Sequence, residues 1–357
     1  MNTYHLAVIP GDGIGPEIIP EAVETLQAIA ARDGGFRFEV TTYDWGSDRY
    51  LATGAMMPAD GLDTLVQAGT DAILLGPVGH PQVPDHVTLW GLLLPIRQHF
   101  RQYVNLRPVR LLPGVASPLS GKAANAIDIV CVRENTEGEY AGIGGRVHRG
   151  EPEEVAVQSI VFTRAGTERV IRYAFDYARA HGRRKVTSAT KSNAMQYNMV
   201  FWDDVFRQVA AEYPEIEHEQ QLIDSLAARF VSRPESLDVV VASNLFGDIL
   251  TDLGAAVTGS LGLAPSANLN PERRFPSLFQ AIHGTAPDIA GQGISNPVAT
   301  LWSAAMLLEH LGEPRAAASL MTAIEHVLEG GRHRTPDLGG SATTREVGAA
   351  VRHQLGA

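Results

Sequence analysis

Short apolar runs alternate with longer helical patterns along almost the whole 357-residue chain. The apolar runs have the length of strands, and the segments between them have the periodicity of amphipathic helices. Strands are expected at about 6–9, 36–42, 71–75, 103–109, 127–133, 155–163, 184–189, 217–223 and 238–242. Helices are expected at about 16–31, 90–102, 165–181, 193–212, 244–254, 297–312 and 314–330. This alternation predicts an α/β protein with a largely parallel sheet, and the length suggests two domains.

Composition and charge exclude several classes of protein. The chain has 29 Lys and Arg against 40 Asp and Glu, a net charge of −11, so neither nucleic acid nor an anionic membrane is an expected partner. The N-terminus has no signal-peptide pattern and no apolar run is long enough to span a bilayer, so a cytoplasmic location is expected. The single cysteine, Cys131, excludes an intramolecular disulfide. It lies in an apolar run, so a buried and unreactive thiol is expected.

Two glycine-rich segments interrupt the pattern. Gly11-Asp-Gly-Ile-Gly-Pro-Glu17 follows the first strand and opens the first helix. Its spacing differs from the G-x-G-x-x-G dinucleotide fingerprint, and it lacks the Lys-Ser/Thr pair of a P-loop. From the residues alone, a tight turn and a nucleotide contact both remain open. The second segment, 142–163, is glycine-rich and charged and then strand-like, which predicts an antiparallel excursion.

Arginines are concentrated in the stretch from 86 to 133. Arg97 and Arg101 are four residues apart on a predicted helix, and Arg107, Arg110 and Arg133 follow. Guanidinium groups suit carboxylates because they donate two parallel charge-assisted hydrogen bonds. A solvated surface position is the alternative for each of them. If they converge, the acidic total of the chain does not exclude an anionic substrate.

Two aspartates on one predicted helix form a candidate metal site. Asp248 and Asp252 are four residues apart, so both carboxylates lie on one face, and neither has a Lys or Arg four residues away. Two unpaired carboxylates repel each other unless a cation lies between them. Mg²⁺ and Mn²⁺ prefer such oxygen ligands. Solvated surface carboxylates remain the alternative.

A loop of small residues runs from His283 through Asp288 to Asn296. Small residues allow the backbone to approach a ligand closely, and an acidic residue in such a loop can bind ribose hydroxyls while repelling a 2′-phosphate. Taken together in chain order, these segments resemble the β-decarboxylating dehydrogenases, a family that includes 3-isopropylmalate and isocitrate dehydrogenases. The segment Val83-Pro-Asp-His-Val-Thr-Leu-Trp-Gly-Leu-Leu-Leu-Pro-Ile-Arg97 most resembles the tartrate/D-malate dehydrogenase branch.

The resemblance covers essentially the whole chain and implies an isopropylmalate/isocitrate dehydrogenase-like α/β fold. Two domains would share a large mixed β-sheet with helices on both faces. The expected division is a discontinuous cofactor-binding domain, 1–102 plus 259–357, and an inserted dimerisation and substrate/metal domain, 103–258. The active site would lie in the cleft between them and against the partner chain.

Positions that match the family's motifs acquire expected roles from the resemblance. Tyr140 is expected to supply a proton late in the reaction, and Lys191 to take part in proton transfer from the substrate hydroxyl. The expected metal ligands are Asp224, Asp248 and Asp252, holding Mn²⁺ or Mg²⁺; a requirement for K⁺ stays open. In the family Lys191 and Asp224 reach across the dimer interface, which implies a homodimer with shared active sites.

Substrate-binding positions follow from the same resemblance. Those expected to hold the malate-like part of the substrate are Arg97, Arg107 and Arg133, and those in the specificity segment are Trp90, Leu93 and Leu94. The serine and asparagine of isocitrate enzymes are missing from that segment. Trp90 stands where isopropylmalate enzymes carry a glutamate, and its indole would leave room only for a short substituent.

Cofactor choice is also implied. The expected cofactor-binding residues are Ile14, Asn193, His283, Gly284, Thr285, Ala286, Asp288 and Asn296. NADP-using relatives place Lys-Tyr at positions 288–289, where this chain has Asp-Ile, so NAD is predicted.

The predicted reaction is NAD-dependent oxidative decarboxylation of a malate-type 2-hydroxy dicarboxylate, with D-malate giving pyruvate and CO₂, or the corresponding reactions of tartrate. Oxidation to a keto acid provides the electron sink for loss of the β-carboxylate. 3-Isopropylmalate dehydrogenation remains an alternative, because Leu93 and Leu94 also suit an isopropyl group. A non-redox, metal-dependent carboxylate lyase is the alternative of a different class. A catalytically silent homologue is disfavoured because Tyr140, Lys191 and the three aspartates are all present.

Overall fold

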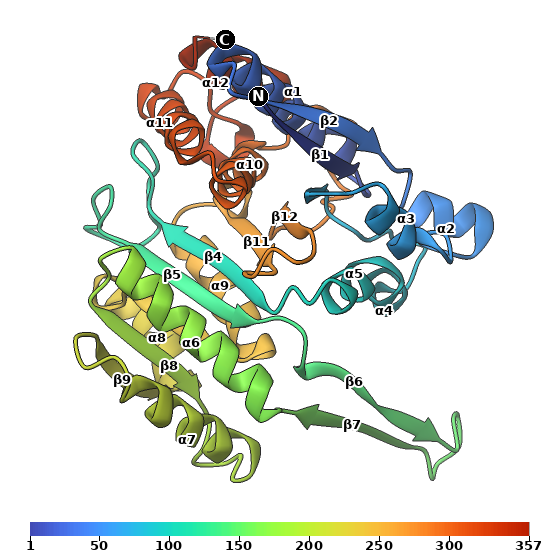
Figure 1. The fold of residues 1–357 in the computed structure, drawn as a ribbon, viewed down its shortest axis with the longest axis vertical. Helices are drawn as coiled ribbons and strands as arrows, with labels where there is room; N and C mark the ends of the chain where they lie inside the picture. Colours follow the sequence, from blue (N-terminus) through green and yellow to red (C-terminus); the bar gives the residue numbers. More distant parts are fainter. Residues whose placement is uncertain (357) are drawn as a thin grey trace.

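One sheet of ten strands runs through the molecule in the computed structural model, which describes residues 1–356 (Figure 1). The strand order is β2-β1-β3-β12-β11-β4-β5-β10-β8-β9. In that order the strands are β2 (Phe36–Thr42), β1 (Asn2–Ile9), β3 (Ala72–Leu75), β12 (Ser277–Ala281), β11 (Pro265–Leu269), β4 (Val104–Arg110), β5 (Asp128–Glu134), β10 (Val239–Ala242), β8 (Lys185–Thr190) and β9 (Glu217–Leu222).

The sheet is parallel at both ends and antiparallel in the middle. Strands β2, β1, β3 and β12 pair in parallel, as do β5, β10, β8 and β9. Between these groups β12, β11, β4 and β5 pair antiparallel. The inner parallel strands β3 and β10 are buried along their whole length, as expected for strands covered by helices on both faces. The predicted α/β class with a large mixed sheet is therefore confirmed.

Helices of both chain ends pack together. Figure 1 shows α1 beside α10, α11 and α12, with both termini at the same end of the molecule. The helices are α1 (Gly15–Asp33), α2 (Ser47–Thr53), α3 (Gly61–Gln67), α4 (Asp85–Thr88), α5 (Leu94–His99), α6 (Arg164–Ala180), α7 (Asn198–Ala210), α8 (Ile223–Ser232), α9 (Asn244–Val257), α10 (Val298–Leu311), α11 (Pro314–Gly330) and α12 (Thr344–Gln354). A π-helical turn, Leu89–Leu93, joins α4 to α5, and short 3₁₀ turns occupy Pro234–Ser236, Leu261–Leu263 and Pro336–Leu338.

Some elements differ from the sequence-based expectation. The expected helix at 90–102 is divided into the π-helical turn and α5, because Pro95 has no N–H to donate within the helix, and α5 ends at His99. Strands β11 and β12 were not expected. Their sequences, Pro-Ser-Ala-Asn-Leu and Ser-Leu-Phe-Gln-Ala, contain none of the β-branched runs that mark a strand.

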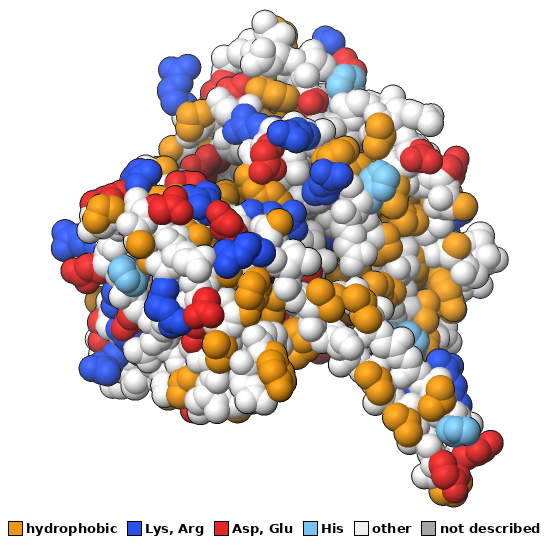
Figure 2. Space-filling model, turned by 60° about the horizontal axis from the view of Figure 1, so that its bottom comes forward, with side chains coloured by type: hydrophobic (Ala, Val, Ile, Leu, Met, Phe, Trp, Pro, Cys, Tyr) orange, Lys and Arg blue, Asp and Glu red, His pale blue; other side chains and the backbone are white. Residues whose placement is uncertain are grey.

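The antiparallel excursion predicted at 142–163 is confirmed. Strands β6 (Gly138–Val147) and β7 (Val155–Val161) form a two-stranded arm that projects from the body of the molecule (Figures 1 and 2). The arm exposes four large aliphatic side chains, Ile143, Val147, Val155 and Val157, each more than half accessible. No helix formed by residues 1–356 has the length and apolarity needed to cross a membrane.

Cys131 lies on β5 and is 1% exposed, and burial raises the pKa of its thiol to about 12. Because only the thiolate is a strong nucleophile, we expect no reaction with a thiol reagent in the folded protein at neutral pH and one equivalent in urea. A chromogenic disulfide reagent measures both. Rapid labelling of the native protein would contradict the buried position.

Candidate active site

Three buried arginines from different elements converge beside helix α9. Arg107 on β4 and Arg133 on β5 come from adjacent antiparallel strands, and Arg97 comes from α5. Their exposed fractions are 5%, 2% and 3%. Burial lowers the pKa of Arg97 well below its usual value, and the charges of Arg133 and Arg107 lower it further. The structure therefore places these three guanidinium groups in one electrostatic cluster, not in separate surface positions.

Asp248 is the anionic centre of this cluster. Its Oδ1 accepts hydrogen bonds from Arg107 Nη1 at 3.0 Å and Arg133 Nη1 at 2.5 Å, and its Oδ2 accepts one from the Tyr140 hydroxyl at 3.2 Å. Burial alone would raise the pKa of Asp248, but the charges of Arg133, Arg107 and Arg97 lower it overall. The expectation that Asp248 is unpaired was wrong. Its partners come from neighbouring strands, which inspection of the helix alone does not reveal.

Asp252, one turn further along α9, has no ion-pair partner among residues 1–356. Loss of hydration and then the negative charge of Asp248 raise its pKa. An unneutralised carboxylate beside a second one fits a bound cation. Within the described residues of a single chain, however, no three acidic, His or Cys side chains come together as a metal site.

The third expected metal ligand, Asp224, lies elsewhere in the chain. At the start of α8, its Oδ1 accepts a hydrogen bond from Lys191 Nζ at 2.6 Å. Lys191 follows the end of β8, and Asn193 lies two residues further on in an exposed position. None of the three forms a hydrogen bond with the Arg107–Arg133–Asp248 cluster. The expected site residues therefore fall into two groups within one chain.

Helix α9 is held against the arginines by residues that the sequence analysis did not select. Gly247 lets the helix approach the side chain of Arg133, since an added Cβ would lie 2.7 Å from Arg133 Cβ. Asn244 Oδ1 accepts hydrogen bonds from Arg133 Nε at 3.1 Å and Nη2 at 2.7 Å. Asn244 Nδ2 donates to the Glu137 carbonyl oxygen at 3.2 Å. Only the tertiary structure shows these contacts.

Glu139 fixes the N-terminus of α9 to the strand that carries Tyr140. Its buried carboxylate accepts hydrogen bonds from Ser243 Oγ at 2.7 Å and Leu245 N at 3.0 Å. A carboxylate at this position satisfies a free helix N–H and interacts favourably with the helix dipole. Because Tyr140 is the next residue, Glu139 also determines where the tyrosine meets Asp248.

Glu139→Ala is expected to lower the free energy of unfolding by about 2 kcal/mol, since a helix cap is lost and buried donors are left unpaired. We also expect a fall in kcat, because Tyr140 is no longer held against Asp248. Chemical denaturation and initial rates measure the two effects. Glu139→Gln should be milder, and Glu153→Ala on the exposed arm should change neither quantity; equal effects of Glu139→Ala and Glu153→Ala would contradict the assignment.

The predicted specificity segment forms the π-helical turn and the start of α5. Leu94 N donates to the Leu89 carbonyl, five residues earlier, which is the hydrogen bond of a π-helix. Leu93 belongs to the apolar core with Trp45 and Met56, whereas Leu94 is buried outside that core. Trp90 is 43% exposed.

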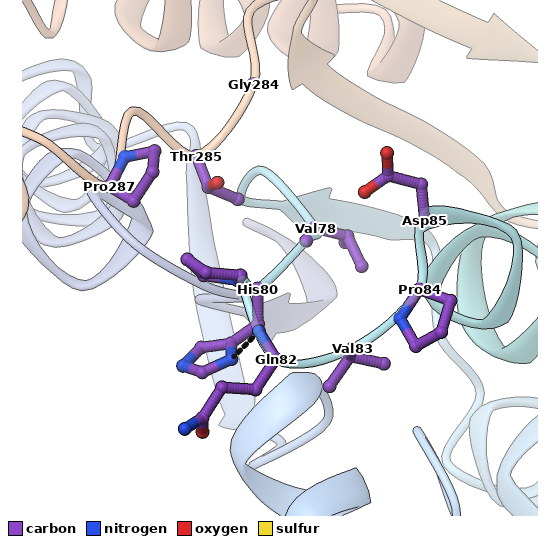
Figure 3. A pocket seen from close by; sticks show the side chains of 11 residues that line it. Val78, His80, Gln82, Val83, Pro84, Asp85, Gly284, Thr285 and Pro287 are labelled. Atoms are coloured by element: carbon purple, nitrogen blue, oxygen red, sulfur yellow. Dashed lines mark hydrogen bonds between the residues drawn. The ribbon is translucent and has the colours of Figure 1, made fainter.

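Two hollows flank the loop that begins at His283. The first has a volume of 570 Å³ and is lined by 78–85 on one wall and by Gly284, Thr285 and Pro287 on the other (Figure 3). The second has a volume of 470 Å³. Its lining includes five of the predicted cofactor residues, namely Ile14, His283, Gly284, Ala286 and Asn296. Asp288 is exposed and, like Asn193, lines neither hollow.

Two polar residues, His283 and Asn296, contribute to the lining of the second hollow. Burial lowers the pKa of His283, so its ring is neutral at neutral pH, and Nε2 is buried without a hydrogen-bond partner. Asn296 is 6% exposed and donates from Nδ2 to Asp337 Oδ2 at 3.0 Å. An orphaned ring nitrogen beside a largely apolar hollow fits the adenosine part of a dinucleotide.

The glycine-rich turn after β1 supports this loop. Ile14 N donates to the Thr285 carbonyl at 3.0 Å, and a Cβ on Gly13 would lie 2.1 Å from the same oxygen. The buried Asp12 carboxylate accepts hydrogen bonds from Ser47 N at 2.7 Å and Gly79 N at 2.8 Å. The segment is a tight turn, as one of the two alternatives had it, and its Ile14 also lines the second hollow; a nucleotide contact stays a prediction.

Comparisons with known proteins agree with this architecture. The family described as isocitrate/isopropylmalate dehydrogenase matches residues 5–351. A probable tartrate dehydrogenase/decarboxylase of Agrobacterium vitis is 54% identical over 98% of this chain and 96% of its own length. The D-malate dehydrogenase [decarboxylating] of Escherichia coli (strain K12) is 52% identical over 98% of both chains.

The structural comparison gives the same result. Isocitrate dehydrogenase from Methylococcus capsulatus superposes with a TM-score of 0.88 at 36% identity, covering 99% of both chains. Family match, sequence identity and shared fold all extend over nearly the full chain. The protein therefore belongs to the isocitrate/isopropylmalate dehydrogenase family.

Proposed function

We propose that this protein is an NAD-dependent and divalent-metal-dependent decarboxylating dehydrogenase that acts on malate-type 2-hydroxy dicarboxylates, D-malate and tartrate among them. The observation that carries the proposal is Arg97. Its guanidinium is buried, has no ion-pair partner among residues 1–356, and has Nε without a hydrogen bond. A buried charge of this kind needs an anion, and a guanidinium fork suits a carboxylate. The curated relatives named for tartrate and D-malate support the same substrate class.

The residues present fit a divalent cation and a dinucleotide. Asp248 and the unneutralised Asp252 supply oxygen ligands, and Asp224 of the second subunit completes the set in this proposal. The loop from His283 to Asn296 would hold the adenosine portion of NAD, with Asn193 near its nicotinamide. When bound, the metal would polarise the substrate oxygens and NAD would accept the hydride. Mn²⁺ and Mg²⁺ both suit these ligands.

The chain's own groups orient the substrate and move protons. Arg97, Arg107 and Arg133 bind its carboxylates and fix its position against Asp248. The Lys191 amino group takes part in proton transfer from the C2 hydroxyl as that carbon is oxidised. After CO₂ leaves, the Tyr140 hydroxyl delivers a proton to C3. Burial and the charge of Asp248 raise the pKa of Tyr140, so the phenol keeps its proton at neutral pH.

Cofactor preference gives one prediction. We expect kcat/KM to be about 100-fold higher with NAD than with NADP, because the Asp288 carboxylate would bind ribose hydroxyls and repel a 2′-phosphate. Initial rates with each cofactor measure this ratio. Asp288→Asn should reduce the discrimination while leaving the reaction with D-malate intact. A preference for NADP would refute the assignment.

The substrate assignment is tested by assaying D-malate, L-tartrate, meso-tartrate and 3-isopropylmalate with NAD, in the presence of Mn²⁺ or Mg²⁺ and with and without K⁺. We expect the highest kcat/KM among the first three. Faster turnover of 3-isopropylmalate would favour the isopropylmalate dehydrogenase alternative. Consumption of a dicarboxylate without NADH formation would favour the non-redox lyase.

The functional unit in this proposal is a homodimer. The aliphatic side chains exposed on the arm, together with Ile249 on α9 and Val231 on α8, give a second copy of the chain an apolar surface to cover. Each subunit would comprise a cofactor-binding domain, 1–102 plus 259–357, and an inserted domain, 103–258. Light scattering should give twice the 38.4 kDa of one chain; a monomer at assay concentration would contradict the shared site.

A further inference from the structure

The indole of Trp90 rests directly on Gly142 of strand β6. A Cβ built on Gly142 would lie 2.4 Å from Trp90 Cη2, 3.0 Å from Cζ3 and 3.3 Å from Cζ2. The edge of the six-membered ring therefore occupies the space that any other side chain at position 142 would need. Gly142 also has φ of +74°, a conformation that favours glycine. The position is thus restricted to glycine for two independent reasons.

The main chain next to Trp90 packs closely against the core. The next residue, Gly91, packs so closely on Met56 that an added Cβ would lie 2.5 Å from Met56 Cγ. Met56 is 2% exposed and belongs to the buried core. The turn has π-helical hydrogen bonding ahead of Pro95. The position of Trp90 therefore differs from the one it would have in a regular α-helix. The main chain beside Trp90 is therefore held against the core, and the indole lies against Gly142 of the arm.

This contact lies next to the candidate active site. Gly142 is two residues beyond Tyr140, a separation of at most about 7 Å between Cα atoms. Trp90 precedes Arg97 by two helical turns. Arg97 interacts electrostatically with both Tyr140 and Asp248. The contact between Trp90 and Gly142 thus joins the segment that presents Arg97 to the strand that presents Tyr140.

We propose that Gly142 is a specificity-determining residue that seats the Trp90 indole as a wall of the substrate pocket, so that only a small substituent at substrate C3 is accepted. The inference rests on the proposed function and adds to it the residue that holds the wall in place. A hydrogen or hydroxyl at C3 fits beside a fixed indole, whereas a branched alkyl group requires the ring to move. Pocket walls discriminate by roughly 10- to 200-fold for each methylene that they exclude.

The test compares kcat/KM for 3-isopropylmalate with kcat/KM for D-malate in the wild type, Gly142→Ala, Trp90→Ala and the double variant. The added methyl group needs the space that the indole occupies and displaces the ring. Gly142→Ala should therefore raise this ratio by roughly 10-fold or more. Trp90→Ala should raise it further. In the Trp90→Ala background the Gly142→Ala change should alter the ratio by less than about twofold, because the clashing ring is gone.

Two matched glycines separate the indole contact from backbone strain. Gly150 lies near the tip of the arm and also has a positive φ, +83°, but an added Cβ there meets no atom within 4 Å. Gly145 lies on β6 with equally open surroundings and no positive φ. We expect Gly150→Ala and Gly145→Ala to leave the ratio unchanged.

Failure of the inference and failure of the proposed function give different results. If the wild type oxidises D-malate but Gly142→Ala shifts the ratio no more than Gly150→Ala does, the seating role is refuted and the proposed function stands. The same conclusion follows if Trp90→Ala leaves the ratio unchanged. If the wild type oxidises neither D-malate nor tartrate, the proposed function itself is wrong, and this inference is overturned with it.

Discussion

Asp248→Asn is expected to lower the free energy of unfolding of the metal-free protein by about 3 kcal/mol. The reason is the burial of its partners, since the side chains of Arg107 and Arg133 are only 6% and 2% exposed. Removing the carboxylate charge leaves these guanidinium groups, and Arg97 beside them, without an anion. The Asp248 side chain is itself 35% exposed, which places the cost at the lower end of the range for a broken buried pair.

Asp252→Asn is the matched control for this prediction. Asp252 lies one turn away on the same helix, and its pKa is raised by loss of hydration and by Asp248. Its negative charge therefore costs stability in the metal-free protein, so the amide should leave the unfolding free energy unchanged or slightly higher. Because Asp248 and Asp252 are both proposed metal ligands, each variant should lose roughly 10³-fold in kcat/KM. Urea denaturation with a chelator at one fixed protein concentration, and rates with Mn²⁺, measure the two effects separately.

The effects of the two substitutions on the free energy of unfolding should have opposite signs at neutral pH, and both effects should shrink as the pH falls. Asp248 has a folded-state pKa below its unfolded value, so its stabilising contribution is complete above about pH 4 and is lost as the pH falls through the folded-state pKa. Asp252 has a raised folded-state pKa, so its cost is present at neutral pH and disappears as the pH falls through that value. An equal loss of stability in both variants at pH 7 would refute the described charge balance.

Mixing two inactive variants is expected to restore about a quarter of wild-type activity. Tyr140→Phe and Lys191→Met should each lower kcat by roughly 10²- to 10⁴-fold as homodimers. If Lys191 acts in the site of the partner subunit, a heterodimer of the two variants contains one intact site and one doubly defective site. Random pairing makes about half of the dimers heterodimers, which gives the expected quarter.

The structural basis is the separation of the two groups within one chain. Lys191 pairs with Asp224 at 2.6 Å, whereas Tyr140 bonds to Asp248 at 3.2 Å in the arginine cluster. Co-refolding of the two variants followed by initial-rate assays tests the prediction. Tyr140→Phe mixed with Asp248→Asn is the control and should stay inactive, because both residues belong to the same half-site. Recovery of activity in the control mixture would exclude a site shared in this way. So would the absence of recovered activity in the mixture of Tyr140→Phe and Lys191→Met.

The central strands show where sequence patterns fall short. β10, Val-Val-Val-Ala, is recognisable because a parallel strand covered on both faces is continuously apolar. β11 and β12 carry no such signal, since their conformation depends on pairing with β4 and β3, strands distant in the chain. The π-helical turn was missed because the sequence analysis expected one helix over 90–102, and the pattern does not show which hydrogen bonds replace the one that Pro95 cannot donate.

The sequence by itself determined the α/β class, the antiparallel arm, the buried state of Cys131 and the family resemblance, because these depend on local periodicity and on residues in a fixed order. Only the tertiary structure showed that Asp248 is neutralised by Arg107 and Arg133, that Arg97 is buried without a partner, and that the Trp90 indole lies against Gly142. Each of these contacts joins segments distant in the chain. A charge or a ring has a defined environment only when folding brings its neighbours within a few ångströms.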